Sequence, residues 1–360
     1  MAERSGTLAE WPRVGEEPSA RALLRSRPED FLVSEELGFE PAGEGEHVFL
    51  LLQKRNLNTL ELVHRIARVS GAPDRDIGYS GLKDRNAVTR QWFSVRMAGR
   101  AEPVWSDLET SGEIRLLQAG RHRRKLRRGV HRANRFSLYL RELAGDRSAL
   151  EQRLVEVQRD GVPNYFGEQR FGRGGSTLVQ ARQWVADGAR RIPRNRRSLY
   201  LSALRAWLFN SVLASRVSTG TWRSVLAGDV CVLQGTRSHF HCDSPDDDIR
   251  QRARRGDLHP ALPLWGKGVR SRALELAAEE LASVAGAPQI CDFLERAGLE
   301  LAWRPARVLA DDFCWQFCDD GGLQLDFALG AGSYATALLA EFIRYHDASG
   351  NNKEQGSEGG

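Results

Sequence analysis

The two ends of this chain carry strand-like patterns and its middle carries helix-like patterns, and this distribution constrains the fold more than any other feature. Period-two alternation predicts strands within 27–143 and again within 313–329. Apolar residues at helical spacing predict helices between 178 and 296. At 360 residues, the chain is also longer than a typical domain with a single hydrophobic core. The simplest arrangement joins the two ends into one α+β sheet domain and inserts the middle as a second domain.

This arrangement sets the expected domain boundaries. We assign residues 1–160 and 310–346 to the sheet domain, 161–309 to the inserted domain, and 347–360 to a disordered, Gly-rich polar tail. Within the sheet domain, Asp319-Asp320-Gly321-Gly322 predicts a hairpin turn between two strands. After it, Ser333 is expected to cap a helix that runs to about Tyr345.

The stretch from Tyr79 to Val95, YSGLKDRNAVTRQWFSV, places a charged loop between two strand-like segments. Asp84 lies there between two cations, Lys83 and Arg85. A neighbouring cation favours an ionised carboxylate and can fix its rotamer, as a catalytic base or nucleophile requires. A solvated surface turn explains the pattern equally simply, and the pattern alone favours that interpretation.

A second block, residues 163–175, reads PNYFGEQRFGRGG and combines three aromatic residues with two arginines and four glycines. Aromatic rings and the guanidinium of Arg170 can stack on unpaired bases. The block lacks the Gly-Lys-Ser/Thr of a phosphate-binding P-loop. An aromatic-packed turn between domains is the competing interpretation.

Positive charge is concentrated in three internal runs, although the net charge is only +5. Residues 121–135 contain eight Lys/Arg and two His with no acid, and two shorter runs follow at 190–197 and 250–255. Of the 52 cationic residues, 47 are arginine, which suits bidentate phosphate contacts better than lysine does. The pattern favours binding to a polyanion such as nucleic acid, with a general preference for arginine as the alternative.

Other classes of protein receive little support. The N-terminus lacks a signal-peptide pattern and no apolar run approaches the length of a membrane span, so we expect a soluble cytoplasmic chain. The five cysteines form no Cys-x-x-Cys pair. Cys314 and Cys318 are four residues apart without a second ligand pair, so we expect reduced thiols and no metal site.

Four segments together resemble one known family. GYSGLKDRNAVTRQWFSV, VPNYFGEQRFGRGGS, RPEDFLVSE and LGAGSYAT are similar to the motifs of the tRNA pseudouridine synthase D family, and the similarity extends from about Arg21 to Tyr345. The resemblance implies a pseudouridine-synthase catalytic domain with a mixed, largely antiparallel sheet, plus an inserted α/β, helix-rich domain. It also implies isomerisation of uridine at position 13 in the D-arm of tRNA, without cofactor or metal.

The resemblance assigns roles to individual residues. Asp84 corresponds to the catalytic aspartate, and Phe31, Asn134 and Phe136 correspond to substrate-pocket residues. Tyr334 occupies a pocket position where related members often carry Phe, so its hydroxyl leaves open whether it only stacks. Arg25 and Lys83 are alternative cationic partners for Asp84. The expected RNA-binding residues are Arg121, Arg123, Arg124, Lys125, Arg127, Arg128 and Arg170.

The implied reaction breaks the uracil N1–C1′ bond and rejoins the base through C5. One carboxylate can attack C1′ or remove a ribose proton, and the sequence does not choose between these routes. The uracil anion delocalises its charge, so a second acid is not required. A non-catalytic RNA-binding or RNA-folding protein remains the main alternative. A glycoside or nucleoside hydrolase would need paired carboxylates, such as Glu35-Glu36 or Asp311-Asp312. The absence of a coiled-coil pattern leads us to expect a monomer.

Overall fold

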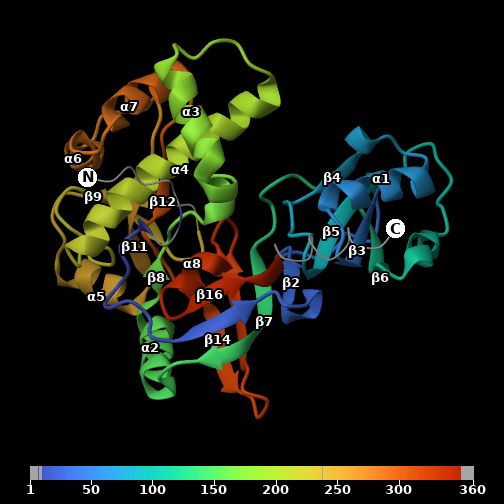
Figure 1. Ribbon diagram of the computed structural model, residues 1–360. Coiled ribbons are helices and arrows are strands. Elements are labelled where there is room, and N and C mark those ends of the chain that lie inside the picture. The colour runs from blue at the N-terminus through green and yellow to red at the C-terminus, as the bar shows by residue number, and fades with distance from the viewer. Residues whose placement is uncertain (1–6, 8–9, 237, 350–360) are drawn as a thin grey trace. The chain divides into compact units, whose positions relative to one another are not determined.

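The computed structural model describes residue 7 and residues 10–236 and 238–349 (Figure 1). Contacts divide the chain into two compact units. Unit 1 consists of Met1–Pro18, Ser148–Leu309 and Ser333–Ile343. Unit 2 consists of Ser19–Arg147, Ala310–Gly332 and Arg344–Gly360. Each unit is therefore assembled from three separate segments of the chain, and each is described by itself below.

Unit 2 is built on a large mixed sheet, with ten strands among the described residues. Seven strands lie in the order β14-β15-β7-β2-β5-β3-β6, while β1 pairs with β7 and β16, and β4 pairs with β5. In the described part of this unit, the pairs β2–β5 and β1–β16 are parallel and the others are antiparallel. The strands are β1 Arg21–Leu24, β2 Phe31–Glu36, β3 His47–Arg55, β4 Ile77–Tyr79, β5 Val88–Arg96, β6 Ile114–His122, β7 Ala133–Ala144, β14 Asp311–Phe317, β15 Leu323–Gly330 and β16 Arg344–Asp347.

Helix α1, Thr59–Ser70, closes one core of this unit. Its apolar stripe, which includes Leu62 and Ile66, packs in one buried cluster with Leu50 of β3 and Phe93 of β5. The helix ends at Gly71, whose left-handed backbone (φ 65°) suits a glycine C-cap. The 3₁₀ turns of this unit are η2 Pro28–Asp30, η3 Asp74–Asp76 and η4 Trp105–Ser111.

Unit 1 is organised around the long helix α4, Arg194–Ser218, which buries residues on several faces. The other helices are α2 Arg147–Asp160, α3 Ser176–Ala186, α5 Asp247–Arg255, α6 Arg272–Ala282, α7 Ala287–Arg296 and α8 Ala335–Ala340, with 3₁₀ turns η5 Glu168–Arg170 and η6 Arg173–Gly175. A small sheet has the order β10-β9-β11-β12, and β8 pairs with β13. These strands are β8 Val162–Pro163, β9 Asp229–Leu233, β10 His239–Cys242, β11 Leu258–Leu264, β12 Ala302–Pro305 and β13 Arg307–Val308.

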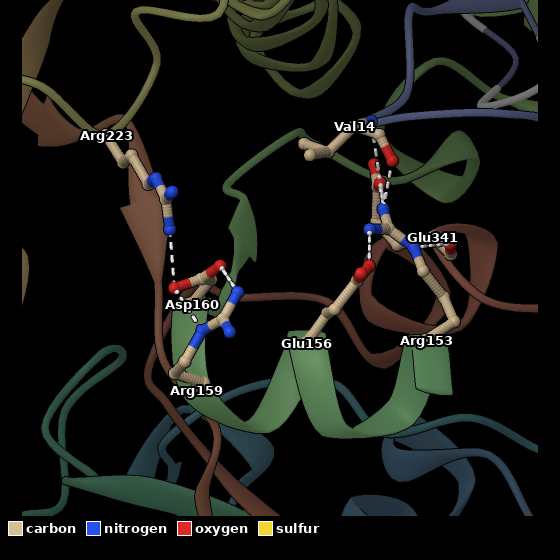
Figure 2. A network of polar contacts seen from close by, with 7 residues as sticks. All are labelled: Val14, Arg153, Glu156, Arg159, Asp160, Arg223 and Glu341. Carbon is tan, nitrogen blue, oxygen red and sulfur yellow. Dashed lines mark hydrogen bonds and ion pairs between the residues drawn. The ribbon is translucent and has the colours of Figure 1, made fainter. Parts of the chain in front are cut away.

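A buried carboxylate holds the N-terminal segment of unit 1 in place (Figure 2). Glu341 follows α8, and its side chain is 3% exposed. Its Oε2 accepts the backbone N–H of Val14 at 2.9 Å and lies 3.2 Å from Nη2 of Arg153 on α2. Burial raises the pKa of Glu341 to about 7, although both partners oppose the rise. Figure 2 also shows Asp160, at the end of the same helix, paired with Arg223 at 2.5 Å.

The hairpin predicted at Asp319-Asp320-Gly321-Gly322 is confirmed, since these residues join β14 to β15. The helix predicted from Ser333 to Tyr345 is wrong in its extent. Tyr334 is the N-cap, α8 ends at Ala340, and residues 344–347 form strand β16 parallel to β1. Strand pairing along β1 outweighs the helical spacing of the preceding apolar run. Asp347 belongs to β16, and the predicted tail lies outside the described residues from position 350.

Two findings concern metal sites and membranes. The described residues contain no group of three or more His, Cys, Asp or Glu side chains that could hold a metal ion. All five cysteines are free, and Cys231, Cys242 and Cys291 are buried. None of the helices in the described ranges is both long enough and apolar enough to cross a bilayer.

Candidate active site

Asp84 lies on the loop that joins β4 to β5 in unit 2. The two strands pair in antiparallel register, with Tyr79 opposite Phe93, and β5 lies inside the sheet between β2 and β3. Gly78 is required here, because a Cβ at that position would lie 2.3 Å from the carbonyl oxygen of Leu126. The loop therefore leaves the sheet from two well-supported strand ends.

Arg25, rather than Lys83, is the cation that contacts the carboxylate of Asp84. Its Nη2 lies 3.1 Å from Asp84 Oδ2, and its Nη1 lies 2.5 Å from Oδ2 of Asp347 on β16. The guanidinium carbon also lies 3.9 Å from the centroid of the Phe31 ring. The side chain of Arg25 is 10% exposed and that of Asp84 is 44% exposed. A largely covered guanidinium that is ion-paired with two carboxylates thus faces, in Asp84, a carboxylate that remains open to solvent.

Lys83 forms a separate ion pair underneath the loop. Its Nζ lies 2.9 Å from Oε2 of Glu35 on β2, and the two side chains are 8% and 0% exposed. Burial raises the pKa of Glu35, and the charge of Lys83 opposes this rise. Glu36, the neighbour of Glu35, instead bonds Arg135 at 3.0 Å, as does Asp312 at 2.9 Å. Three of the four carboxylates considered for hydrolysis, Glu35, Glu36 and Asp312, are therefore engaged in ion pairs.

A second lysine, missed in the sequence, supports the backbone of Asp84. Lys54 on β3 is fully buried, and its Nζ donates to the carbonyl oxygen of Asp84 at 2.8 Å. Burial lowers the pKa of Lys54 to about 8, opposed by the charge of Asp84 and assisted by that of Lys83. In the described part of the chain, Lys54 forms no ion pair shorter than 4 Å. Its ammonium is thus committed to the loop.

Polar side chains fix the remaining backbone of the loop. The N–H of Lys83 donates to Oγ1 of Thr59 at 3.0 Å, and the hydroxyl of Thr59 donates to Oε1 of Gln91 at 3.3 Å. Gln91 in turn donates through Nε2 to the carbonyl oxygen of Gly81. Residues of α1 and β5 therefore hold the segment that precedes Asp84.

A histidine relay, also missed in the sequence, connects the loop to Asn134. Nδ1 of His131 lies 2.9 Å from Oγ of Ser80, and Nε2 lies 3.2 Å from Nδ2 of Asn134. Burial lowers the pKa of His131 to about 4, with a further contribution from the charge of Lys83. The ring is therefore neutral at physiological pH and acts as a fixed hydrogen-bonding spacer.

The structure brings Phe31 and Phe136 together, but as buried side chains. Their ring centroids are 6.2 Å apart in an edge-on arrangement, and Phe136 stacks on Phe327 at 5.1 Å. Phe31 is 1% exposed and Phe136 is 7% exposed. A base that stacked on either ring would have to displace a covering group, such as the Arg25 guanidinium.

Tyr334 belongs to unit 1, whereas Asp84 belongs to unit 2. Its hydroxyl accepts hydrogen bonds from Nε and Nη2 of Arg170, at 3.1 and 2.7 Å. Arg170 also donates to Oγ of Ser202 at 2.9 Å. The hydroxyl of Tyr334 is therefore a hydrogen-bond acceptor within its unit, and the predicted RNA-binding residue Arg170 is engaged with it.

The basic run at 121–135 is partly neutralised by contacts within unit 2. Arg121 pairs with Glu102, and Arg123 pairs with Glu44. The remaining predicted contacts divide into two groups: Lys125 and Arg128 donate to the Arg75 carbonyl and the Tyr79 hydroxyl, whereas Arg124 and Arg127 are exposed. A polyanion would have to compete with acids for part of this run.

Comparisons with known proteins agree on one family. The model of the family described as tRNA pseudouridine synthase D (TruD) matches residues 13–179 and 175–342. A "tRNA pseudouridine synthase D" of Methylococcus capsulatus is 46% identical over 334 residues, which cover 93% of this chain and 94% of the relative. The protein of that name from Nitrosococcus oceani is also 46% identical, with the same coverage. A solved structure from Methanosarcina mazei with the same family description has a TM-score of 0.62 at 19% identity, and the match covers 94% of this chain and 96% of that one, which supports the fold.

Proposed function

Because the chain belongs to the tRNA pseudouridine synthase D family, we propose that it isomerises uridine to pseudouridine at position 13 of tRNA, with Asp84 as the catalytic carboxylate. The observation that carries the assignment of Asp84 is its ion pair with Arg25 at the end of two sheet strands. Ion pairing favours the ionised carboxylate, and the supported loop fixes its position. A solvated turn would need neither the buried Lys54 nor the buried Glu35–Lys83 pair.

The reaction rearranges one nucleotide without gain or loss of atoms. The N1–C1′ bond breaks, a C5–C1′ bond forms, C5 loses its proton and N1 gains one. Asp84 either attacks C1′ and is later displaced, or removes a ribose proton so that a glycal forms. Both routes begin with an ionised carboxylate next to the ribose. Neither route requires a redox partner or a cofactor.

The uridine must leave its base stack to reach Asp84. We assign its contacts to Phe31, Asn134 and Phe136 in unit 2, and to Tyr334. Because Arg25 covers the Phe31 ring, we expect the incoming base to displace that guanidinium from the ring. The basic side chains at 121–128 would contact phosphates, which position RNA without reading its sequence.

The same proposal assigns roles to the parts of the chain. We place the catalytic domain at 1–160 and 310–346 and a family-specific inserted domain at 161–309. The contact-defined units differ from this division, since Met1–Pro18 and Ser333–Ile343 pack with the middle of the chain. Five free thiols, three of them buried, suit a reducing compartment, so we propose that the enzyme is cytoplasmic. We also propose that it acts as a monomer.

Tritium release from C5 of uridine-labelled tRNA tests this function. We expect release by the wild type, no release by Asp84→Asn, and similar tRNA binding by both. Asp243→Asn, at an exposed aspartate of unit 1, is the matched control and should retain activity. Binding without release by the wild type would identify a non-catalytic RNA-binding protein. Retained activity in Asp84→Asn would refute the assignment of the carboxylate.

A further inference from the structure

Unit 1 carries an exposed group of arginines at the start of α4, which we call the α4 arginine patch. The patch consists of Arg190, Arg191, Arg194, Arg196 and Arg197. From residue 188 to residue 228 the sequence contains eight arginines and no Asp or Glu. Such a local excess of one charge creates a strong positive potential at the surface.

The side chains of the patch lack acidic partners. Among the described residues, none of the five forms an ion pair with a carboxylate. The preceding acid, Asp187, accepts a hydrogen bond from Gln183 at 2.8 Å. In the basic run of unit 2, by contrast, Arg121 and Arg123 are both paired with glutamates. The patch therefore offers positive charge that a polyanion can neutralise without first breaking ion pairs.

The backbone under the patch is anchored to the core of unit 1. The indole N–H of Trp184 donates to the carbonyl oxygen of Arg190 at 2.7 Å, and Trp184 packs edge-on against Phe293 with ring centroids 5.2 Å apart. Ile192 also packs against the large buried cluster of this unit. Arg191, Arg194 and Arg197 line a hollow of about 520 Å³. The charges are thus presented from a fixed base.

The position of the patch is unfavourable for the free protein. Three of the arginines lie in the first turn of a 25-residue helix, which has no acid there and no side-chain cap. Cations near a helix N-terminus oppose the helix dipole. Of the three, Arg197 also donates through Nη2 to the carbonyl oxygen of Ala297 at 3.2 Å, so the unfavourable position applies most directly to Arg194 and Arg196. Their arrangement is better explained by binding than by folding.

We propose that the α4 arginine patch binds backbone phosphates of tRNA, an inference that rests on the proposed tRNA substrate. Guanidinium groups match phosphate oxygens in bidentate geometry and release condensed counterions on binding. An acidic protein would also be attracted to this charge. However, the patch has neither interspersed acids nor a large apolar surface, and arginines alone suit a phosphate backbone better than a protein surface. The patch would anchor tRNA on the unit that does not carry Asp84.

The salt dependence of tRNA binding tests this inference, with Asp84→Asn as the background so that no turnover occurs. The plot of log K for tRNA binding against log salt concentration has a negative slope. Each lost phosphate contact should reduce the magnitude of this slope by about 0.7–0.9. The triple variant Arg191→Gln, Arg194→Gln and Arg196→Gln, which leaves the Arg197 hydrogen bond to Ala297 intact, should therefore reduce the magnitude of the slope by about 2–3. Its unfolding temperature should remain unchanged or rise, because the dipole repulsion is relieved.

A matched control removes three arginines that are already ion-paired. Arg96, Arg250 and Arg272 are each about half exposed, at 51%, 50% and 54%, and each is paired with an acid. Changing all three to Gln alters net charge equally, and we expect a slope change of less than about one contact. Equal slopes in the two triple variants, no slope change in the patch variant, or a markedly lower unfolding temperature of that variant would each overturn the proposal.

The two proposals fail in different ways. If the wild type releases no tritium but the patch variant flattens the salt dependence, the isomerase proposal fails and the patch remains a tRNA-binding surface. If tritium is released and the two triple variants have equal slopes, the enzyme assignment stands and the patch assignment fails.

Discussion

Replacement of Lys54 tests whether the support under Asp84 matters for catalysis. Lys54→Met removes the ammonium that donates to the Asp84 carbonyl at 2.8 Å, while retaining most of the buried side-chain volume. A hydrogen bond from a charged donor contributes about 1.5–3 kcal/mol. If that energy positions the loop for the transition state, kcat should fall about 10- to 150-fold.

The pH dependence gives a sharper signature than the rate alone. With a pKa of about 8, Lys54 loses its charge in the folded protein well below the pH at which an ordinary lysine does. Two charges face it: Asp84, which favours the protonated form, and Lys83, which opposes it. We therefore expect kcat of the wild type to decline above about pH 8, and Lys54→Met to lack this decline.

Stability should change in the opposite direction over the same range. Because the folded-state pKa of Lys54 is below its ordinary value of 10.5, the unfolded chain binds more protons between pH 8 and 10.5. The contribution of Lys54 to the free energy of unfolding therefore rises with pH there, by up to about 3 kcal/mol. Loss of activity above pH 8 then cannot be attributed to unfolding through this group.

The assay is single-turnover tritium release from pH 6 to 10, with urea unfolding measured in parallel. Lys54→Arg provides the control, because a permanently charged donor should move the decline in kcat to higher pH. Any ionisation of the substrate itself would affect the wild type and both variants alike. An unchanged alkaline decline in Lys54→Met, or a kcat within about threefold of wild type at pH 7, would refute the reasoning.

Two further predictions concern buried carboxylates. Lys83→Met should lower the free energy of unfolding by about 3–5 kcal/mol, because it leaves Glu35 buried and unpaired. In urea unfolding, adding Glu35→Gln should restore much of this loss. If the effects of the two substitutions were fully additive, the pairing would be contradicted. The second concerns Glu341, whose pKa is raised to about 7, so that between pH 4.5 and 7 the folded state binds a proton that the unfolded chain has lost. The free energy of unfolding should therefore fall, by about 3 kcal/mol at most, as the pH rises through this range. Thermal unfolding of Glu341→Gln should show a smaller fall, and an identical pH profile would show that Glu341 does not titrate in this range.

Local patterns predicted the segments from which the site is built. The turn residues after β14 identified a hairpin, and the charged loop between two strand-like segments identified the surroundings of Asp84. Both signals depend on neighbours in sequence, where turn chemistry and period-two alternation act directly. The family motifs supplied the order of these segments along the chain.

The partners of the loop could not be read from the sequence, because they depend on strand register. Lys54 is 30 residues from Asp84, and Ser80 is 51 residues from His131. A shift of one residue in β3 would turn Lys54 to the other face of the sheet. The same limitation explains β16, where pairing with β1 replaced the expected last turns of a helix.

The sharing of Arg25 between two carboxylates bears on the catalytic role that we propose for Asp84. A cation bound to Asp84 alone would stabilise the ground state and reduce the basicity or nucleophilicity that either chemical route requires. In the structure Arg25 lies closer to Asp347, at 2.5 Å, than to Asp84, at 3.1 Å. Asp347 thus shares the positive charge of Arg25, and the ion pair of Asp84, whose side chain is 44% exposed, contributes little energy of its own. Placement of Asp84 must then come from the backbone of the loop, and the buried Lys54 and the Glu35–Lys83 pair support that backbone without contacting the carboxylate oxygens of Asp84.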